Sequence, residues 1–450
     1  MATSTPSAGK RAGKQLHLFG FVIHSPMNHT VGSWRHPRNN SLGYSFAEPE
    51  MWQEVARTLE RGKFDGIFFA DQLAAYSTYR GSRDAALRHA VQFPIHDPLL
   101  LIPMMAASTR HIGLLSTLSV SYYAPYMAVR KLSTLDHLTK GRIGWNIVTS
   151  FHQGEALNMG LEKMTPHDER YARADEFLEV CHKLWNSWEK DAVVMDRAGD
   201  VFVDPTKVHE IEHRGKYFSC PGFSPVTPSP QGHPVLIQAG ASGPGRDFCA
   251  KWAEGAFTIQ LTGRALASYA EDIRERARRA GRAKVPKVIA GIQIIVGENE
   301  RAAREKQEEL NELVSVEGSL ALLSGHTGYD FSKRDLDTLV EDIQDLPGIQ
   351  GLFEVFTKMH HEKVSLRTAA ALYGRSVAQP QIVGDPEQVA DQLIKLAEES
   401  SVDGFNITPT YTPGSFAEVV DLVVPVLQQR GAFRKEYAGT TLREHFEQTE

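Results

Sequence analysis

The stretch 234–254 reads PVLIQAGASGPGRDFCAKWAE and contains the pattern that decides the fold. Residues 234–238 predict a short buried strand, the small residues after them a tight turn, and residues 247–254 a helix. A turn between a strand and a helix directs free backbone N–H groups at one point, where an anion can bind. Ser242 adds a hydroxyl donor, so the stretch indicates a phosphorylated ligand, although such a turn can also be only a tight connection.

The turn does not match the common nucleotide motifs. Gly240, Gly243 and Gly245 lack the spacing of the G-x-G-x-x-G dinucleotide fingerprint, and the lysine of a P-loop is missing. The sequence therefore predicts no nicotinamide site at this turn.

The alternation of strand and helix extends along the whole chain. Eight apolar runs predict strands at residues 16–23, 66–70, 112–118, 142–148, 235–239, 255–259, 287–296 and 404–408. Helical patterns occur at 50–62, 97–109, 126–137, 169–188, 245–253, 262–280, 300–313 and 415–429. Continuous apolar runs are typical of parallel strands that are buried on both faces. We therefore expect an α/β fold, a (β/α)8 TIM barrel, formed by one domain over residues 15–450.

Several segments exceed what a minimal barrel needs. We expect long insertions near residues 24–47, 72–96, 190–233 and 314–384, and a disordered tail at 1–14, which is rich in small and polar residues. Long insertions in a compact domain are usually functional or disordered. These insertions contain aromatic residues, among them Trp34, Tyr76 and Phe93, so we predict ordered loops and lids.

Composition narrows the class of protein. The 450 residues are 42% hydrophobic and 23% charged, with a net charge of −6, which is typical of a globular protein and gives no basic surface for nucleic acid. Three distant cysteines suggest no disulfide framework. We expect no transmembrane segment and no signal peptide, and hence a cytoplasmic protein.

Polar residues stand where the predicted strands end. Asp71, Thr117, Asn146 and Ser242 each follow or end an apolar run. Because the active sites of TIM barrels form at the carboxyl ends of the strands, these residues are candidates for a common site. Helix capping is the alternative for each of them.

Histidines supply further candidates. His167 and Tyr171 are four residues apart at the start of a predicted helix and share one face there. His326 lies between glycines, where we expect a loop and either a pocket donor or a turn residue. His209 and His213 match the zinc motif H-E-x-x-H, but their context predicts strand and turn, so we expect no metal site.

Segments along nearly the whole chain resemble one family. They are residues 60–71 (ERGKFDGIFFAD), 122–126 (YYAPY), 135–150 (LDHLTKGRIGWNIVTS), 170–177 (RYARADEF), 238–246 (QAGASGPGR) and 403–407 (DGFNI). In this combination the chain resembles the bacterial-luciferase-like flavin monooxygenases, in the branch of nitrilotriacetate monooxygenase and dibenzothiophene-sulfone monooxygenase.

The resemblance implies a cofactor and its contacts. It implies a barrel that binds reduced FMN, supplied by a separate NAD(P)H:flavin oxidoreductase, with O2 as co-substrate. The cofactor contacts it implies are Asp71, Thr117, Asn146, His167, Tyr171 and Ser242. Asn146 would face the isoalloxazine, and Ser242 would hold the phosphate. Homodimers or homotetramers are usual in this family.

The substrate is less well defined by the sequence. The segment around His326 resembles that of the sulfone monooxygenases, so we expect a small organic substrate, either organosulfur or xenobiotic, with His326 and Asn146 as catalytic residues. Phe21 and Phe257 would line an apolar substrate pocket, or belong to the core. Halogenated aromatics stay open, as do aminopolycarboxylates, for which Arg80, Arg83 and Arg88 could supply charge. A deazaflavin-dependent reductase and a non-catalytic flavin-binding protein are the alternative functions.

Overall fold

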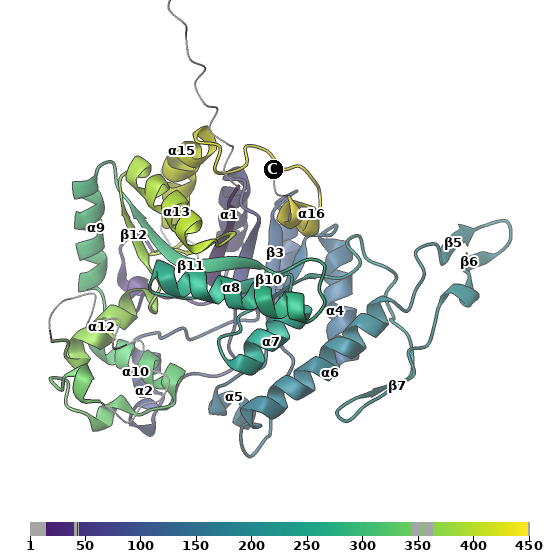
Figure 1. Cartoon of the computed structure of the whole chain (residues 1–450), viewed down its shortest axis with the longest axis horizontal. Helices are drawn as coiled ribbons and strands as arrows, with labels where there is room; N and C mark the ends of the chain where they lie inside the picture. The colour runs from purple at the N-terminus through teal and green to yellow at the C-terminus, as the bar shows by residue number, and fades with distance from the viewer. Residues whose placement is uncertain (1–14, 40–42, 44, 344–352, 354–362, 449–450) are drawn as a thin grey trace, which may run out of the picture.

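The computed structural model describes residues 15–39, 43, 45–343, 353 and 363–448 (Figure 1). The expected tail at residues 1–14 and parts of the first and fourth insertions lie outside the described residues. Among the described helices, none has the length and hydropathy that crossing a membrane requires.

All eight expected strands form, and they close into a parallel barrel, which confirms the predicted fold. They are β1 (His17–Ile23), β2 (Gly66–Ala70), β3 (Gly113–Ser119), β4 (Ile143–Val148), β9 (Val235–Gln238), β10 (Gly255–Thr258), β11 (Lys287–Val296) and β13 (Gly404–Thr408). Closure follows because β1 pairs with both β2 and β13, while β10 pairs with both β9 and β11. The carboxyl ends of all eight strands therefore lie at one face of the barrel.

Helices surround the barrel (Figure 1). They are α1 (Pro49–Arg61), α3 (Ile102–Ala107), α4 (Pro125–Leu138), α6 (His167–Trp185), α7 (Gly243–Trp252), α8 (Gly263–Arg279), α9 (Glu300–Glu312), α13 (Pro386–Ser400), α14 (Gly414–Glu418) and α15 (Val424–Gln429). A π-helical turn over Val419–Val423 joins α14 to α15. The α1 helix buries an apolar stripe formed by Trp52, Val55 and Leu59.

The insertion near residues 314–384 contains helices that the sequence did not predict. These are α10 (Val316–Thr327) and α12 (Leu366–Ser376), which pack against each other, and they are followed by a short strand β12 (Gln381–Gly384) that pairs with β11. Our expectation of a loop at His326 is wrong, because His326 lies in the last turn of α10. The flanking Gly325 is helical and packs so closely on Tyr76 that an added Cβ would lie 2.2 Å from its ring.

Two other insertions are ordered. Within the segment near 72–96, α2 (Asp84–Arg88) packs against α10. Within 190–233, β5 (Val193–Asp196) and β6 (Val201–Val203) form a hairpin that projects from the barrel (Figure 1), and β7 (His213–Arg214) pairs with β8 (Ser219–Cys220).

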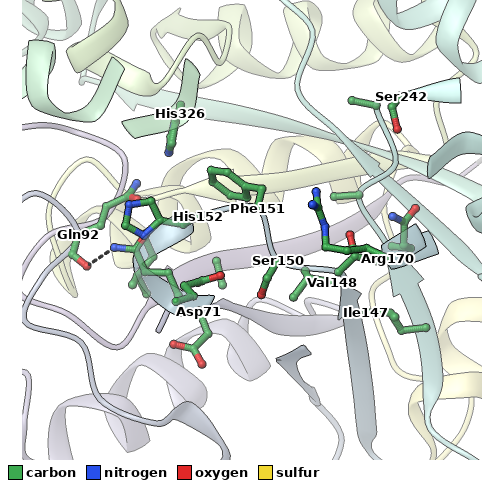
Figure 2. A pocket seen from close by; sticks show the side chains of 18 of the residues that line it. Asp71, Gln92, Ile147, Val148, Ser150, Phe151, His152, Arg170, Ser242 and His326 are labelled. Atoms are coloured by element: carbon green, nitrogen blue, oxygen red, sulfur yellow. Dashed lines mark hydrogen bonds between the residues drawn. The ribbon is translucent and has the colours of Figure 1, made fainter. Parts of the chain in front are cut away.

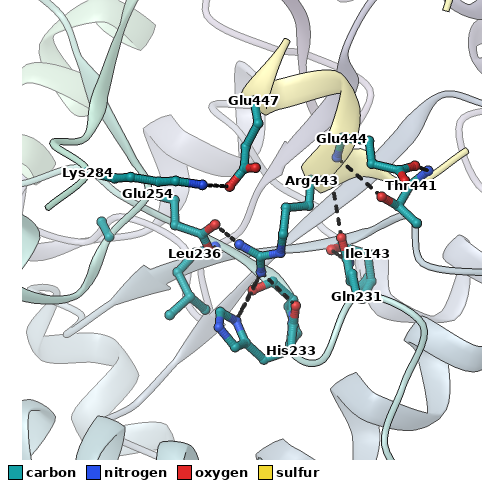
Figure 3. Close-up of polar contacts among 12 residues, drawn as sticks. Ile143, Gln231, His233, Leu236, Glu254, Lys284, Thr441, Arg443, Glu444 and Glu447 are labelled. Carbon is teal, nitrogen blue, oxygen red and sulfur yellow. Dashed lines mark hydrogen bonds and ion pairs between the residues drawn. The ribbon is translucent and has the colours of Figure 1, made fainter. Parts of the chain in front are cut away.

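The amino-terminal face of the barrel is closed by α16 (Leu442–Glu447). Leu442 and Phe446 pack into the bottom of the barrel beside Gly113 and Gly255, the first residues of β3 and β10. Arg443 pairs with Glu254 and donates to the carbonyl of His233 at 3.0 Å (Figure 3). These contacts seal the end opposite the strand carboxyl termini.

Candidate functional site

A cavity of about 420 Å³ opens at the carboxyl ends of the strands. The strand-end residues in its wall include Ile23, Asp71, Val148 and Gln238. This volume falls within the roughly 300–1,000 Å³ that is usual for small-molecule sites. Figure 2 shows Ser242 and Arg170 at one end of the cavity and His326, His152 and Gln92 at the other. The two ends differ in chemistry and are described in turn.

The first end is formed by the turn that the sequence singled out. Ser242 is the N-cap of α7, and its hydroxyl accepts a hydrogen bond from the Gly245 N–H at 3.2 Å. The first N–H groups of a helix lack intrahelical acceptors and attract an anion. Glycine is required by close packing, since a Cβ on Gly240 would lie 2.4 Å from the carbonyl oxygen of Gly245. The Tyr171 hydroxyl would lie 2.7 Å from a Cβ on Gly245, which places Tyr171 at the same turn.

Arg170 also lines this end, and the sequence analysis did not select it. Its Nη1 donates to the carbonyl of Thr165 at 2.5 Å, while its buried Nε has no partner among the described residues. Burial lowers the pKa of its guanidinium, a sign that the cation lacks full solvation. No other arginine or lysine of the described residues lines the cavity. A half-buried cation beside a helix N-terminus fits a phosphate group.

His167 is at the same end but is more peripheral. It begins α6 and its side chain is 44% exposed, with Nδ1 2.8 Å from the carboxylate of Asp168. Its ring contacts Tyr171 edge-on at 5.1 Å. The structure therefore brings together the three residues expected at the phosphate, Ser242, Tyr171 and His167.

Asn146 and Thr117 face each other across β3 and β4. The Asn146 amide donates to the Thr117 hydroxyl at 2.8 Å, and that hydroxyl donates to the carbonyl of Phe69 at 2.7 Å. This leaves the buried Asn146 Oδ1 without a partner among the described residues. Thr117 lines a second cavity of about 230 Å³, which shares Asp71 and other wall residues with the first. Asn146 itself lines neither cavity, but a buried amide oxygen without a partner is a candidate acceptor for a ligand N–H.

Asp71 lies between the two cavities. Burial and the nearby carboxylates of Asp97 and Glu155 raise the pKa of its carboxyl to about 7. Glu155 is itself buried; one of its carboxylate oxygens accepts from the N–H of Leu73 at 2.9 Å, and the other has no described partner. Buried carboxyl groups such as these destabilise the fold, and their presence at a cavity is typical of functional sites.

We expect the Asp71→Asn variant to be more stable than the parent protein at pH 8 and similar to it near pH 4. The raised pKa means that the native state holds a proton that the unfolded state releases above about pH 4, so the carboxyl destabilises the fold increasingly up to pH 7. Removing this cost should raise the free energy of unfolding by about 1–3 kcal/mol at pH 8. Urea unfolding at several pH values measures it. The exposed Asp168→Asn variant is the control, and an equal pH dependence in both variants would contradict the assignment.

The second end of the cavity is neutral and aromatic. His326 contacts two tyrosines, with Nε2 2.9 Å from the Tyr76 hydroxyl and Nδ1 2.6 Å from the Tyr373 hydroxyl. Burial, with His152 adding to it, lowers the pKa of His326 to about 4. At neutral pH the ring is uncharged, which favours an orienting role over that of a cationic acid. Phe151 lies near the ring and is 58% exposed at the cavity mouth.

Phe21 and Phe257, expected either to line a pocket or to belong to the core, pack inside the barrel. Both belong to a buried cluster with Phe68 inside the barrel, and neither is among the described residues that line the cavity. The core alternative therefore describes their packing better. Ile23, a member of the same cluster, lines the cavity, and so does His29, whose ring lies 4.3 Å from that of Phe21.

The zinc motif does not form a metal site. His209 pairs with Glu189 at 2.9 Å, while His213 lies in β7 with Nε2 3.3 Å from the carboxylate of Glu176. The motif therefore lies in a strand and the segment before it, as its sequence context predicted. The described residues contain no cluster of three or more His, Cys, Asp or Glu side chains able to hold a metal ion.

Fold and site together define the class of protein, a TIM-barrel enzyme whose cavity has a helix N-terminus and an arginine at one end and aromatic side chains at the other. The model of the luciferase-like monooxygenase family matches residues 29–404, and the chain belongs to this family. The chain is thus a monooxygenase.

Individual relatives agree with the family. The chain is 42% identical to the dibenzothiophene-sulfone monooxygenase of Rhodococcus erythropolis (strain XP), over 96% of each protein. The solved structure of DmoA from Hyphomicrobium sulfonivorans superimposes with a TM-score of 0.91 at 40% identity, covering 96% of this chain and 92% of that one. A riboflavin lyase solved with modified FMN and riboflavin gives a TM-score of 0.86 at 33% identity, covering 96% of each chain.

Proposed function

We propose that this chain is the oxygenase component of a two-component system that uses reduced FMN and O2. The observation that carries the proposal is the first end of the cavity, which Arg170 and Ser242, the N-cap of α7, line together. The riboflavin lyase of similar structure is solved with modified FMN, which agrees with this assignment.

The remaining cofactor contacts follow from the strand ends. The unpartnered Asn146 Oδ1 would accept from the isoalloxazine, and Thr117 would hold the Asn146 amide in that orientation. Asp71 would lie beside the ring edge, protonated in part at neutral pH because of its raised pKa of about 7. When bound, reduced FMN supplies the activation of O2, and the chain positions the substrate and excludes water.

The reduced cofactor has to come from another protein. The sequence has no dinucleotide fingerprint at its glycine-rich turn, so we infer that an NAD(P)H:flavin oxidoreductase delivers reduced FMN. We also expect a homodimer or homotetramer, as in the family that the sequence resembles.

The substrate class follows from the second end of the cavity. Tyr76, Gln92, His152 and His326 line it. Burial lowers the pKa of both histidines, to about 4 for His326, and so favours uncharged rings. This end of the wall lacks arginine and lysine, and a weakly polar molecule without negative charge suits it, so we propose a small organosulfur or aromatic substrate of the sulfone type.

An aminopolycarboxylate would need cationic side chains in the cavity wall to pair with its carboxylates. The candidate arginines pair with Glu317 or lie outside the cavity lining. Arg80 pairs with Glu317 at 2.9 Å, and Arg88 lies 3.8 Å from the same carboxylate. Arg83 is exposed and does not line the cavity among the described residues. The wall therefore disfavours this substrate class.

The test combines the purified chain with a flavin reductase, NADH, FMN and 18O2. We expect 18O to enter a neutral aromatic sulfone or organosulfur compound, with little or no turnover of halophenols and aminopolycarboxylates. A parallel reaction with reduced deazaflavin under nitrogen should give no product. Turnover in that reaction would identify a deazaflavin-dependent reductase instead, and tight binding of oxidised FMN without turnover would indicate a flavin-binding protein.

A further inference from the structure

Tyr373 is a buried residue of α12 that does not line the cavity among the described residues, yet it contacts a residue that does. Its hydroxyl lies 2.6 Å from His326 Nδ1. On the other side of the ring, His326 Nε2 lies 2.9 Å from the Tyr76 hydroxyl, which donates to Gln92 Oε1 at 3.1 Å. Four side chains from three separate segments therefore form one chain of hydrogen bonds that ends in the cavity wall.

The protons available on these groups decide which of them donates in each hydrogen bond. In the described part of the structure the Tyr373 hydroxyl has His326 Nδ1 as its hydrogen-bond partner. The Tyr373 hydroxyl proton therefore forms a hydrogen bond only if Tyr373 donates to Nδ1. A neutral ring then carries its proton on Nε2 and donates it to the Tyr76 oxygen, which leaves the Tyr76 proton for Gln92. The reverse direction would leave the buried Tyr373 proton without an acceptor, which is costly.

We propose that Tyr373 is a positioning residue that fixes the Nε2–H tautomer of His326 and, through it, the orientation of the Tyr76 hydroxyl and the Gln92 amide at the substrate end of the cavity. The proposal rests on the proposed function for its effect on turnover. The part that concerns the tautomer of His326 involves only side chains of this protein and does not depend on the proposed reaction. Tyr373 acts through His326, because it does not itself line the cavity.

The surroundings of His326 agree with a neutral ring. The titratable groups that face it are Tyr373 from α12, Tyr76 from the second insertion, His29 from the first insertion and His152 from the segment after β4. None of these is a carboxylate that would stabilise an imidazolium. A donor at Nδ1 blocks protonation there, so its removal raises the pKa of His326 and frees the ring to exchange tautomers.

The direct test is 15N NMR of histidine-labelled protein, which separates the two tautomers by the shifts of Nδ1 and Nε2. The His326 signal is assigned as the one lost in His326→Asn. We expect a single Nε2–H tautomer in the parent protein, and in Tyr373→Phe a mixture of tautomers that titrates at higher pH. A parent spectrum with the Nδ1–H form, or an unchanged spectrum in Tyr373→Phe, would overturn the proposal whether or not a substrate is turned over.

Kinetics provide the second readout. In Tyr373→Phe we expect kcat/KM to fall about tenfold at neutral pH, with the acid limb of the pH profile moved upward and the affinity for FMN unchanged. In the His326→Asn background the same substitution should have no further effect, whereas additive losses would contradict action through His326. Tyr411→Phe is the matched control, since Tyr411 is also buried and donates to Glu418 at 2.6 Å, away from the cavity lining.

Discussion

Replacing Arg170 with alanine is expected to weaken the binding of FMN by about 30- to 100-fold and to leave riboflavin binding unchanged. The guanidinium is the one cation among the described residues that line the cavity, and its buried Nε has no described partner. A charge-assisted hydrogen bond to a phosphate is worth about 2–3 kcal/mol in such a place. Riboflavin lacks the phosphate, so it reports on the ring contacts alone.

Fluorescence titration with oxidised FMN and with oxidised riboflavin measures the affinities for the two flavins. Arg173→Ala is the matched control, because Arg173 is on the same helix but its guanidinium packs over Phe218, away from the cavity lining. Equal weakening of FMN and riboflavin in Arg170→Ala would show that the arginine supports the fold of the site rather than the phosphate.

The second large effect is on the free energy of unfolding, and it concerns Asp65, at the face of the barrel opposite the cavity. Asp65 is fully buried; its carboxylate accepts from Arg434 Nη2 at 2.6 Å and from the Leu18 N–H at 2.8 Å, and it lies 2.7 Å from His17 Nδ1. Asp65→Ala leaves the buried guanidinium of Arg434 without its counter-ion, so we expect a loss of about 3–5 kcal/mol in the free energy of unfolding. Urea unfolding followed by circular dichroism measures it.

A surface pair provides the comparison. Arg61 and Asp421 form an ion pair in which both side chains are about half exposed, at 55% and 51%. Asp421→Ala should therefore cost less than about 1 kcal/mol. If both substitutions cost the same, the burial of the Asp65 pair would not be what makes it important.

The sequence predicted the barrel because its signal is local. Each of the eight strands is a short apolar run, and each run is recognisable without knowledge of its neighbours. The α10 helix was missed for the opposite reason. Its Gly325 suggests a loop, but the glycine is accommodated within the helix by the ring of Tyr76, a contact with a residue far away in the chain.

The sequence likewise predicted some residues of the candidate site and missed others. Asp71, Thr117 and Ser242, which line the two cavities, could be selected because a barrel places every strand end at one face, and Asn146 was selected on the same ground but lines neither cavity. Arg170 could have been found from its position one residue before Tyr171 at a helix start, but an exposed arginine has the same pattern. The sequence left the place of Phe21 and Phe257 open, because an apolar residue at a strand end can face either the core or a pocket, and the structure packs both in the core.

The sequence by itself determined the barrel, the face that carries the site and the glycine-rich turn, since all three depend on residues that are close in the chain. Only the tertiary structure decided the chemistry of the substrate end. His326 meets Tyr76 across 250 residues and Tyr373 across 47, and no local pattern predicts such hydrogen bonds. Burial among those partners keeps the histidine neutral, and burial is a property of the folded chain alone.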